Sequence, residues 1–296
     1  MKNWDQNRIM AEVERIERFI KAYVQEQENI VVPISGGLDS DVVARLCNRS
    51  VGKEHVRLFI VVQSDMESKF LRNARELAQE LGIPLAEIHL EDMNQKLISA
   101  LEEGESDRIF RTDMMLDPAK AKCSVRSSVI SCYQDKGFLI AGTTNRTEKE
   151  LGFFLTFGDN LANFKPIAHL YKMQVRMLAE YLGTSRDVID QASSAGFWEG
   201  QTDMEDIAYW IVNDGPIVYP RTFSDEEIRQ ADKIKDLLTD KAIEQVLELY
   251  GKAVSTEDIM RNSELPEDVV VGILHIVEKA KVLKNRNIMV ELEKEI

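Results

Sequence analysis

Short runs of apolar residues alternate with amphipathic segments along the first half of the chain. The runs predict buried strands in four segments: 29–34, 56–62, 86–90 and 138–141. Apolar positions recur at helical spacing in three segments around them: 9–25, 67–81 and 119–133. Strands that alternate with helices in this way are typical of a parallel sheet with helices on both faces. We therefore predict an α/β fold with a doubly wound parallel sheet.

The pattern changes at about Asp203, where strand-like runs end and helical spacing dominates. Two serine–acid pairs have the spacing of helix caps, and one proline stands where a final helix would open: Ser224 with Glu227, Ser255 with Asp258, and Pro266. No linker-like sequence separates the two parts. We expect residues 1–207 to form the α/β domain and residues 208–296 to form a helical C-terminal extension packed on it.

The charge of the chain limits the partners that it can bind. The 51 acidic and 37 basic side chains give a formal net charge of −14, so most of the surface repels a phosphate backbone. We expect no nucleic-acid partner. The sequence has no leader pattern and no window of about 18 uncharged apolar residues, so we expect no membrane contact and a cytoplasmic protein. The cysteines form no CxxC pair and are odd in number, which favours reduced thiols over disulfides or a zinc site.

One turn carries the residue types of a phosphate-binding site. The sequence Ser35-Gly36-Gly37-Leu38-Asp39-Ser40 stands where the first predicted strand gives way to a helix. Glycines at such a turn let the backbone approach an anion, and the amides and the helix dipole stabilise its charge. The serine hydroxyls add donors, and the aspartate could hold Mg²⁺ against phosphate oxygens. No Gly-Lys-Ser/Thr follows, so this is not the kinase-type phosphate loop.

This turn, SGGxDS between a strand and a helix, resembles the loop of the PP-loop ATP pyrophosphatases. The resemblance implies an adenine nucleotide alpha-hydrolase-like fold and an enzyme that cleaves ATP to AMP and pyrophosphate while it activates a carboxyl or carbonyl oxygen. Amide ligases and RNA sulfur transferases share the loop. A sulfur transferase would need basic surface and a reactive cysteine, for which Cys123 near Arg126 is the candidate. A nucleotide sensor without catalysis is the other alternative.

Further segments resemble the ammonia-dependent NAD synthases, and they occur in the same order. These segments are 142–148, 151–154, 157–159, 166–167, 170–172, 178–183 and 194–203. Together with the turn at Ser35 they extend the resemblance over residues 10–207. The resemblance implies an ATP-dependent ligase that adenylates the carboxylate of deamido-NAD and amidates it with ammonia. It also implies a homodimer.

The resemblance assigns roles to single residues. The catalytic residues would be Asp39, Lys172 and Arg126, and Mg²⁺ would bind to Asp39 and Glu148. ATP would contact Ser35, Gly36, Gly37, Asp39, Ser40, Arg126, Thr143, Lys172 and Ser194. The acid substrate would contact Arg126, Thr156, Asp159 and Asn163. These residue types suit the reaction because attack of a carboxylate on the α-phosphorus leaves charge on pyrophosphate, which a divalent cation, a lysine and backbone amides stabilise.

The chain departs from the family pattern where the acid substrate would bind. NAD synthases have a lysine where Thr156 stands, an aspartate where Asn163 stands, and His-Lys-Arg where residues 283–285 read Leu-Lys-Asn. The stretch 209–253 is also longer than in the compact members of the family. Two interpretations follow. The chain is a divergent NAD synthase that holds deamido-NAD through other groups, or it is a relative that amidates a different carboxylate.

The residues outside these motifs bear on the source of the nitrogen. One predicted helix precedes the turn at Ser35, and no glutaminase sequence is present. We therefore expect the nitrogen to come from free ammonia or from a separate glutaminase partner.

Overall fold

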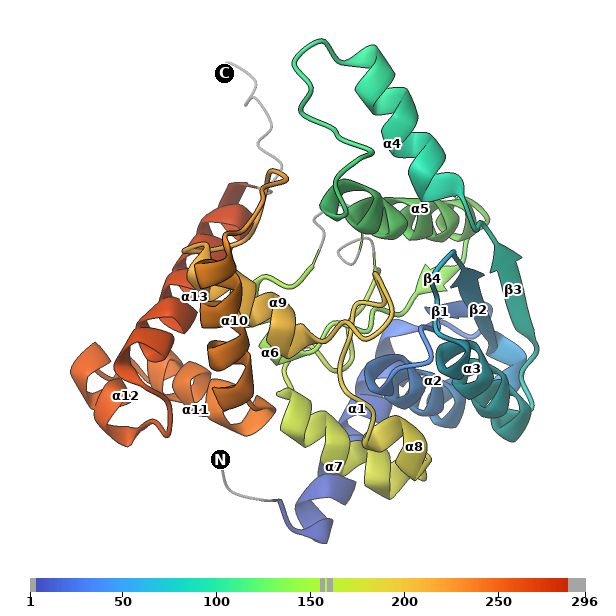
Figure 1. The fold of residues 1–296 in the computed structure, drawn as a ribbon. Helices are drawn as coiled ribbons and strands as arrows, with labels where there is room; N and C mark the ends of the chain where they lie inside the picture. Colours follow the sequence, from blue (N-terminus) through green and yellow to red (C-terminus); the bar gives the residue numbers. More distant parts are fainter. Residues whose placement is uncertain (1–3, 155–157, 159–161, 287–296) are drawn as a thin grey trace, which may run out of the picture.

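A four-stranded parallel sheet forms the centre of the N-terminal part of the chain (Figure 1). The computed structural model describes residues 4–154, 158 and 162–286. The strands lie in the order β3-β2-β1-β4 and comprise β1 (Ile30–Pro33), β2 (Val56–Val62), β3 (Leu85–His89) and β4 (Leu139–Ile140). Each pair of neighbouring strands is parallel, and Ile30 of β1 lies opposite both Val56 and Leu139. The predicted parallel sheet is confirmed, although β4 is shorter than its apolar run.

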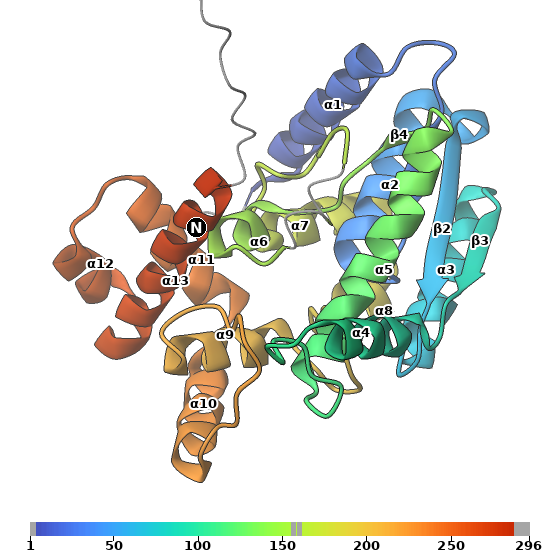
Figure 2. The same cartoon turned by 90° about the horizontal axis from the view of Figure 1, so that it is seen from above.

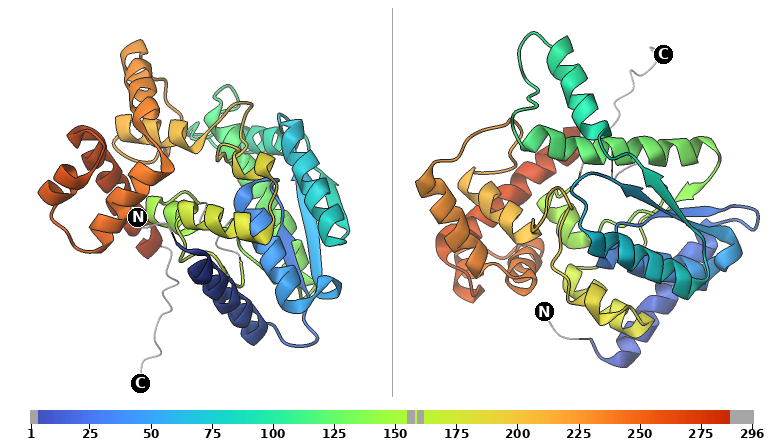
Figure 3. Two further views of the ribbon diagram at one scale, coloured as in Figure 1. Left: turned by 90° about the horizontal axis from the view of Figure 1, so that it is seen from below. Right: turned by 45° about the vertical axis from the view of Figure 1, so that its right-hand side comes forward.

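Successive side chains of the central strand enter two different cores. Ile30 and Val32 pack with four helices: α1 (Gln6–Tyr23), α2 (Leu38–Val51), α3 (Ser68–Leu81) and α7 (Lys172–Leu182). Val31 packs on the other face with Phe59, Ile140 and residues of α5 (Leu116–Asp135). Because neighbouring residues of a strand point to opposite faces, β1 is buried on both sides, as its continuous apolar run predicts. The right-hand view in Figure 3 shows α5 across the sheet from α2 and α3.

Some short or exposed helices are additional to the helices predicted in the N-terminal part of the chain. Helix α4 (Met93–Gly104) buries only Asn94 and Ile98, while Met93 and Leu97 are exposed. It packs chiefly on α5, so only a narrow face of the helix is buried. Two other short elements are the 3₁₀ turn Lys53–His55 and α8 (Arg186–Ile189).

The C-terminal part is helical, as predicted. It comprises α9 (Asp203–Val212), α10 (Asp225–Leu237), α11 (Asp240–Gly251), α12 (Thr256–Asn262) and α13 (Glu267–Arg286). Ser224 and Ser255 cap α10 and α12, because each hydroxyl accepts a hydrogen bond from the backbone amide three residues later. Helix α13 begins directly after Pro266. Among the described helices, none combines the length and the apolar character that a membrane crossing requires.

These C-terminal helices have a hydrophobic core of their own, which reaches back to the first part of the chain. It takes in Leu151, at the end of α6 (Arg146–Leu151), and Tyr171, which directly precedes α7. Figure 2 shows α6 and α7 between the C-terminal helices and the sheet. The two short helices are therefore in contact with both halves of the molecule.

The strand order places a crevice beside β1. The chain adds β2 and β3 on one side of β1 and then returns to place β4 on the other side. At such a switch point the turns that follow the two neighbouring strands diverge, and ligands bind between them at the carboxyl ends of the strands. The turn after β1 holds Ser35, and the turn after β4 holds Gly142 and Thr143. The fold thus places the two motif turns together.

Candidate active site

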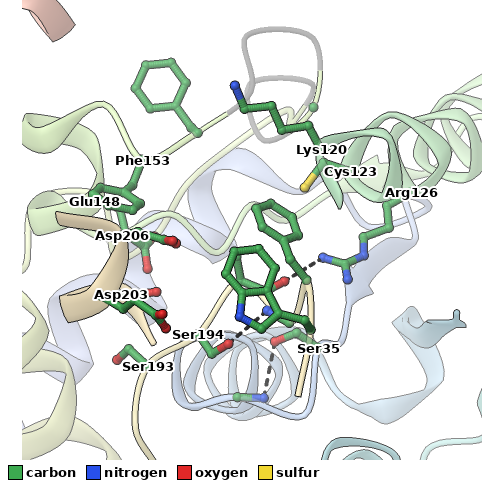
Figure 4. Close-up of a pocket in the computed structure, with 18 of the residues that line it drawn as sticks. Ser35, Lys120, Cys123, Arg126, Glu148, Phe153, Ser193, Ser194, Asp203 and Asp206 are labelled. Carbon is green, nitrogen blue, oxygen red and sulfur yellow. Dashed lines mark hydrogen bonds between the residues drawn. The ribbon is translucent and has the colours of Figure 1, made fainter. Parts of the chain in front are cut away.

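A cavity of about 750 Å³ lies at this crevice. Its walls come from the turn after β1, the turn after β4, α5, and the first helices of the C-terminal part. Figure 4 shows Lys120 and Arg126 projecting from α5 on one side, while Asp203 and Asp206 lie on the other side, with Ser35 between them. Basic and acidic side chains therefore face the cavity from different elements.

The turn after β1 requires glycine at Gly36. Its φ is +76°, and a Cβ atom there would lie 2.1 Å from the carbonyl oxygen of Phe70. Asn73 on α3 donates a hydrogen bond of 3.1 Å to the carbonyl oxygen of Gly36. The hydroxyls of Ser35 and Ser40 lie 3.2 Å apart and bond to each other. The turn is therefore held firmly at the N-terminus of α2, where backbone amides and two hydroxyls are placed to bind an anion.

One lysine lies between two carboxylates at the edge of this turn. Lys172 opens α7 and has only 6% of its surface exposed. Its ammonium donates to Asp39 and lies 3.8 Å from Oε1 of Glu148. Asn145 donates to the other oxygen of Asp39 at 3.1 Å, and it also caps α6 in a reciprocal pair of bonds with Glu148. The two carboxylates are thus placed by α2 and α6, and the lysine by α7.

Burial and mutual charge shift the protonation of this group. Burial and the charge of Asp39 raise the pKa of Glu148 well above its usual range. Burial alone would lower the pKa of Lys172, but Asp39 and Glu148 outweigh it, so the pKa is raised and the lysine stays charged. Burial also raises the pKa of Asp203 to about 6, and burial together with Asp203 raises that of Asp206 to about 7. An additional cation would stabilise the ionised form of these acids.

A loop between α8 and α9 forms another wall, and side chains of α5 hold it. Arg126 donates to the carbonyl oxygen of Ala195 at 3.2 Å, and Lys122 donates to that of Phe197 at 2.5 Å. Within the loop, the hydroxyl of Ser194 accepts the amide of Gly196 at 3.0 Å. The loop is therefore ordered by internal and external bonds, and its aromatic side chains line the cavity.

The end of the cavity nearest the C-terminal helices is aromatic. Phe153 and Trp210 stack with their ring centroids 4.3 Å apart, and Tyr209 meets Phe223 edge to face at 4.9 Å. The ammonium of Lys120 donates to a backbone carbonyl in the segment between α9 and α10, which joins this wall to α5. Stacked rings of this kind bind planar groups well.

Most of the chain matches one protein family. The model of the NAD synthase family matches residues 12–240, which include the cavity wall from Ser35 to Phe223. The chain belongs to the NAD synthase family. The resemblance inferred from the motifs is confirmed, and with it the assignment to a family of ligases that form carbon–nitrogen bonds.

Curated relatives in the family align with most of the chain. The NH(3)-dependent NAD(+) synthetase of Methanocaldococcus jannaschii is 27% identical over 270 residues, which cover 90% of this chain and 91% of that protein. The protein of the same name from Pyrococcus horikoshii is 30% identical over 268 residues, which cover 88% of this chain and 96% of that protein. Alignments of this length extend into the C-terminal helices.

Solved structures show the same fold. The NMN synthetase from Francisella tularensis superposes with a TM-score of 0.68 at 20% sequence identity, covering 99% of this chain and 100% of that one. The NH3-dependent NAD synthetase from Campylobacter jejuni superposes with a TM-score of 0.66 at 21% identity, covering 97% and 99%. The predicted fold class is confirmed.

The structure brings most of the predicted ATP-site residues to one cavity. The lining includes Ser35, Gly37, Asp39, Ser40, Arg126, Thr143, Glu148, Lys172 and Ser194. Gly36 lies in the same turn and packs against α3. These positions agree with the predicted site, while the contact of each residue with ATP or Mg²⁺ stays a prediction.

The predicted contacts to the acid substrate are only partly brought together. Arg126 lines the cavity, whereas Asn163 is exposed and is not one of the lining residues. The side-chain oxygen of Asn163 accepts the backbone amide of Ile140 at 2.8 Å, so this residue supports β4. Thr156 and Asp159 lie outside the described residues, as do the side chains of residues 283–285.

Three acids of this region have no role in the sequence analysis. Asp203 and Asp206 open α9 and line the cavity, and Glu244 is fully buried on α11. A recognisable signal exists for Glu244, because it lies between Ile243 and Val246 on the apolar face of an amphipathic helix. An unpaired acid at such a position is rarely tolerated, so it indicates a buried polar contact.

Proposed function

We propose that this chain is an ATP-dependent amide ligase that adenylates the carboxylate of deamido-NAD and amidates it with ammonia. The observation that carries the proposal is the position of Lys172 between Asp39 and Glu148 beside the turn at Ser35. A lysine, a phosphate-binding turn and two carboxylates that can hold a divalent cation are the groups needed to stabilise a departing pyrophosphate. The curated relatives, named as NH(3)-dependent NAD(+) synthetases, support the same reaction.

The reaction has two steps. In the first step, a carboxylate oxygen of the acid attacks the α-phosphorus of ATP, the bond to the bridging oxygen breaks, and pyrophosphate leaves. Lys172 and the amides after Ser35 stabilise the charge on the leaving group. In the second step, ammonia attacks the acyl carbon, AMP leaves with the acyl oxygen, and the nitrogen releases a proton.

The acidic residues of the site fit a magnesium ion. Mg²⁺ is usually held by one or two carboxylates together with phosphate oxygens of a substrate. Asp39 and Glu148 supply two carboxylates that approach the same ammonium, while the described residues contain no cluster of three or more metal-binding side chains. When bound there, the ion would neutralise charge on the phosphates.

The choice of acid substrate is expected to depend on which carboxylate fits the aromatic end of the cavity. Phe153, Tyr209, Trp210 and Phe223 form this end, and the last three belong to the stretch that is longer than in compact NAD synthases. The same fold is found in a protein described as an NMN synthetase. Amidation of a smaller pyridine carboxylate, such as nicotinate mononucleotide, is therefore the second candidate function.

Other features of the protein are proposed from the family. We expect the cytoplasm as its location, a homodimer as its assembly, and free ammonia or a separate glutaminase as its nitrogen source. The division into residues 1–207 and 208–296 stays a proposal, because α9 spans that boundary and the core of the C-terminal helices takes in Leu151 and Tyr171 of the first part.

The test is AMP and pyrophosphate formation from ATP, MgCl₂ and ammonium, with deamido-NAD, nicotinate mononucleotide or no acid. Deamido-NAD is expected to give NAD with stoichiometric AMP and pyrophosphate, and Asp39→Ala is expected to abolish both products. Turnover only with the mononucleotide would establish the second candidate. Turnover with neither acid would contradict both.

A further inference from the structure

A buried carboxylate from the C-terminal helices reaches the two helices that carry Glu148 and Lys172. Glu244 lies on α11 and has 0% of its surface exposed. Its carboxylate accepts a hydrogen bond of 2.8 Å from the hydroxyl of Thr147 on α6. It also accepts the backbone amide of Met173 in the first turn of α7, at 3.2 Å. One side chain therefore joins three helices.

The hydroxyl of Thr147 extends this contact to Lys172. It donates to Glu244 and accepts the backbone amide of Lys172 at 3.1 Å. Amides in the first turn of a helix have no partner within the helix, and negative charge is favourable there. Glu244 thus satisfies two such amides of α7, one directly and one through Thr147. Because Thr147 directly precedes Glu148, these hydrogen bonds fix the backbone at Glu148 and at Lys172.

We propose that Glu244 is a positioning residue of the ATP site, which holds α6 and α7 so that Glu148 and Lys172 face the same phosphates. The inference rests on the proposed function, in which these two residues act on Mg²⁺-bound ATP. Glu244 is not one of the residues that line the cavity, so it acts through its neighbours. The C-terminal helices then contribute to nucleotide binding as well as to the wall for the acid.

Variants at two other residues of α11 serve as controls that distinguish a positioning role from a packing role. Val246 is as buried as Glu244 but apolar, so Val246→Ala loosens the same helix without removing these hydrogen bonds. Asp240 joins α11 to α7 at another point through Arg176, at 3.0 Å. Asp240→Asn therefore weakens a second contact between the same helices while the amide of Lys172 keeps its partner.

The experiment measures binding of a non-hydrolysable ATP analogue with MgCl₂ to the full chain by isothermal titration calorimetry. Glu244→Ala and Thr147→Val are each expected to weaken binding about tenfold, because they release the first turn of α7. Val246→Ala and Asp240→Asn are expected to change it by less than about threefold. Glu244→Gln keeps an oxygen that can accept from Thr147 and Met173, so it is expected to restore binding to within about threefold of the wild type.

A double substitution shows whether Glu244 acts through Lys172. In the Lys172→Ala background, Glu244→Ala is expected to cost clearly less than it does in the wild type, because one of the two groups that it positions is gone. Losses that multiply would overturn the proposal, as would a folded Glu244→Ala protein that binds like the wild type. If Glu244→Ala does not fold, Thr147→Val with and without Lys172→Ala gives the same comparison and leaves the Glu244 side chain in place.

The result is separable from the proposed function. A wild-type protein that binds the analogue but does not use deamido-NAD would overturn the acid substrate and leave this test intact. A wild-type protein that does not bind the analogue would overturn both.

Discussion

The Glu148 carboxylate lies 3.8 Å from the ammonium of Lys172, and Asp39 accepts a hydrogen bond from the same ammonium. One ammonium thus lies beside two partly buried carboxylates, and burial together with the charge of Asp39 raises the pKa of Glu148. A divalent cation bound there would favour the ionised form of both carboxylates, and Lys172 would then be able to turn to phosphate oxygens. A change at Lys172 therefore affects nucleotide binding and both carboxylates.

Replacing Lys172 tests this arrangement in turnover. Lys172→Ala is expected to lower kcat for pyrophosphate release about 10²- to 10³-fold, because a positioned cation no longer stabilises the leaving group. The measurement is pyrophosphate formation at saturating ATP and acid. Lys241→Ala is the control, since Lys241 is exposed and pairs with Glu264 at 3.0 Å. A loss of less than about fivefold would contradict the role, since that is small for a group of this kind.

Gly36 is expected to tolerate no side chain. Gly36→Ala places a Cβ atom 2.1 Å from the Phe70 carbonyl oxygen at a φ of +76°, so either the turn or α3 must move. The free energy of unfolding is expected to fall by about 3 kcal/mol or more, as measured by urea denaturation. Gly104→Ala is the matched control, because its Cβ atom would meet nothing within 4 Å. Equal stability of the two variants would contradict the steric argument.

Asp206 is expected to make the stability of the protein depend on pH. Burial and Asp203 raise its pKa in the folded chain to about 7, whereas an unfolded aspartate has a pKa of about 3.9. Between these values the folded chain keeps a proton that the unfolded chain releases, so the free energy of unfolding falls as pH rises and levels off above about 7.

Asp206→Asn removes this titration and keeps an oxygen for the bond from Gln201. The variant is expected to gain about 1–2 kcal/mol relative to the wild type between pH 5 and pH 8, after allowance for partial solvent screening. Urea denaturation at the two pH values measures the difference. Parallel pH curves for the two proteins would show that Asp206 does not titrate in this range.

Trp210 tests the position of the acid substrate. Trp210→Leu removes the ring that stacks on Phe153, and KM for the acid is expected to rise about tenfold while KM for ATP stays unchanged. Initial rates with each substrate varied in turn give both constants. Trp4→Leu is the control, because Trp4 lies in the N-terminal segment and does not line the cavity. This substitution is expected to alter neither KM value. Equal increases in both KM values would place the ring at the nucleotide instead.

The sheet and the phosphate-binding turn could be predicted because their physical signals are local. Strands buried on both faces are continuous apolar runs, and the turn at Gly36 needs glycine for its φ. The motifs also led to Asp39, Glu148 and Lys172, which the structure brings together although they are far apart in the chain.

Other features depend on contacts that the sequence does not show. Helix α4 has apolar residues at helical spacing, but Met93 and Leu97 among them are exposed, and only Asn94 and Ile98 are buried. The partners of Glu244 lie on helices that are distant in sequence, and a single acid does not reveal which amides it will meet. The resemblance predicted a substrate contact for Asn163, yet its side chain bonds to the backbone of Ile140. The geometry of the chain, rather than residue type, decides these cases.

The hydrogen bonds of Glu244 also affect when, during synthesis, the protein can first bind nucleotide. Chains emerge from the ribosome N-terminus first, and early segments fold as they appear. The sheet, the turn at Ser35, α6 and α7 are synthesised before residue 244. The carboxylate that joins α6 to α7 is therefore synthesised after them. A nascent chain can therefore form its α/β core early, while its nucleotide site matures only once α11 has left the exit tunnel and docked.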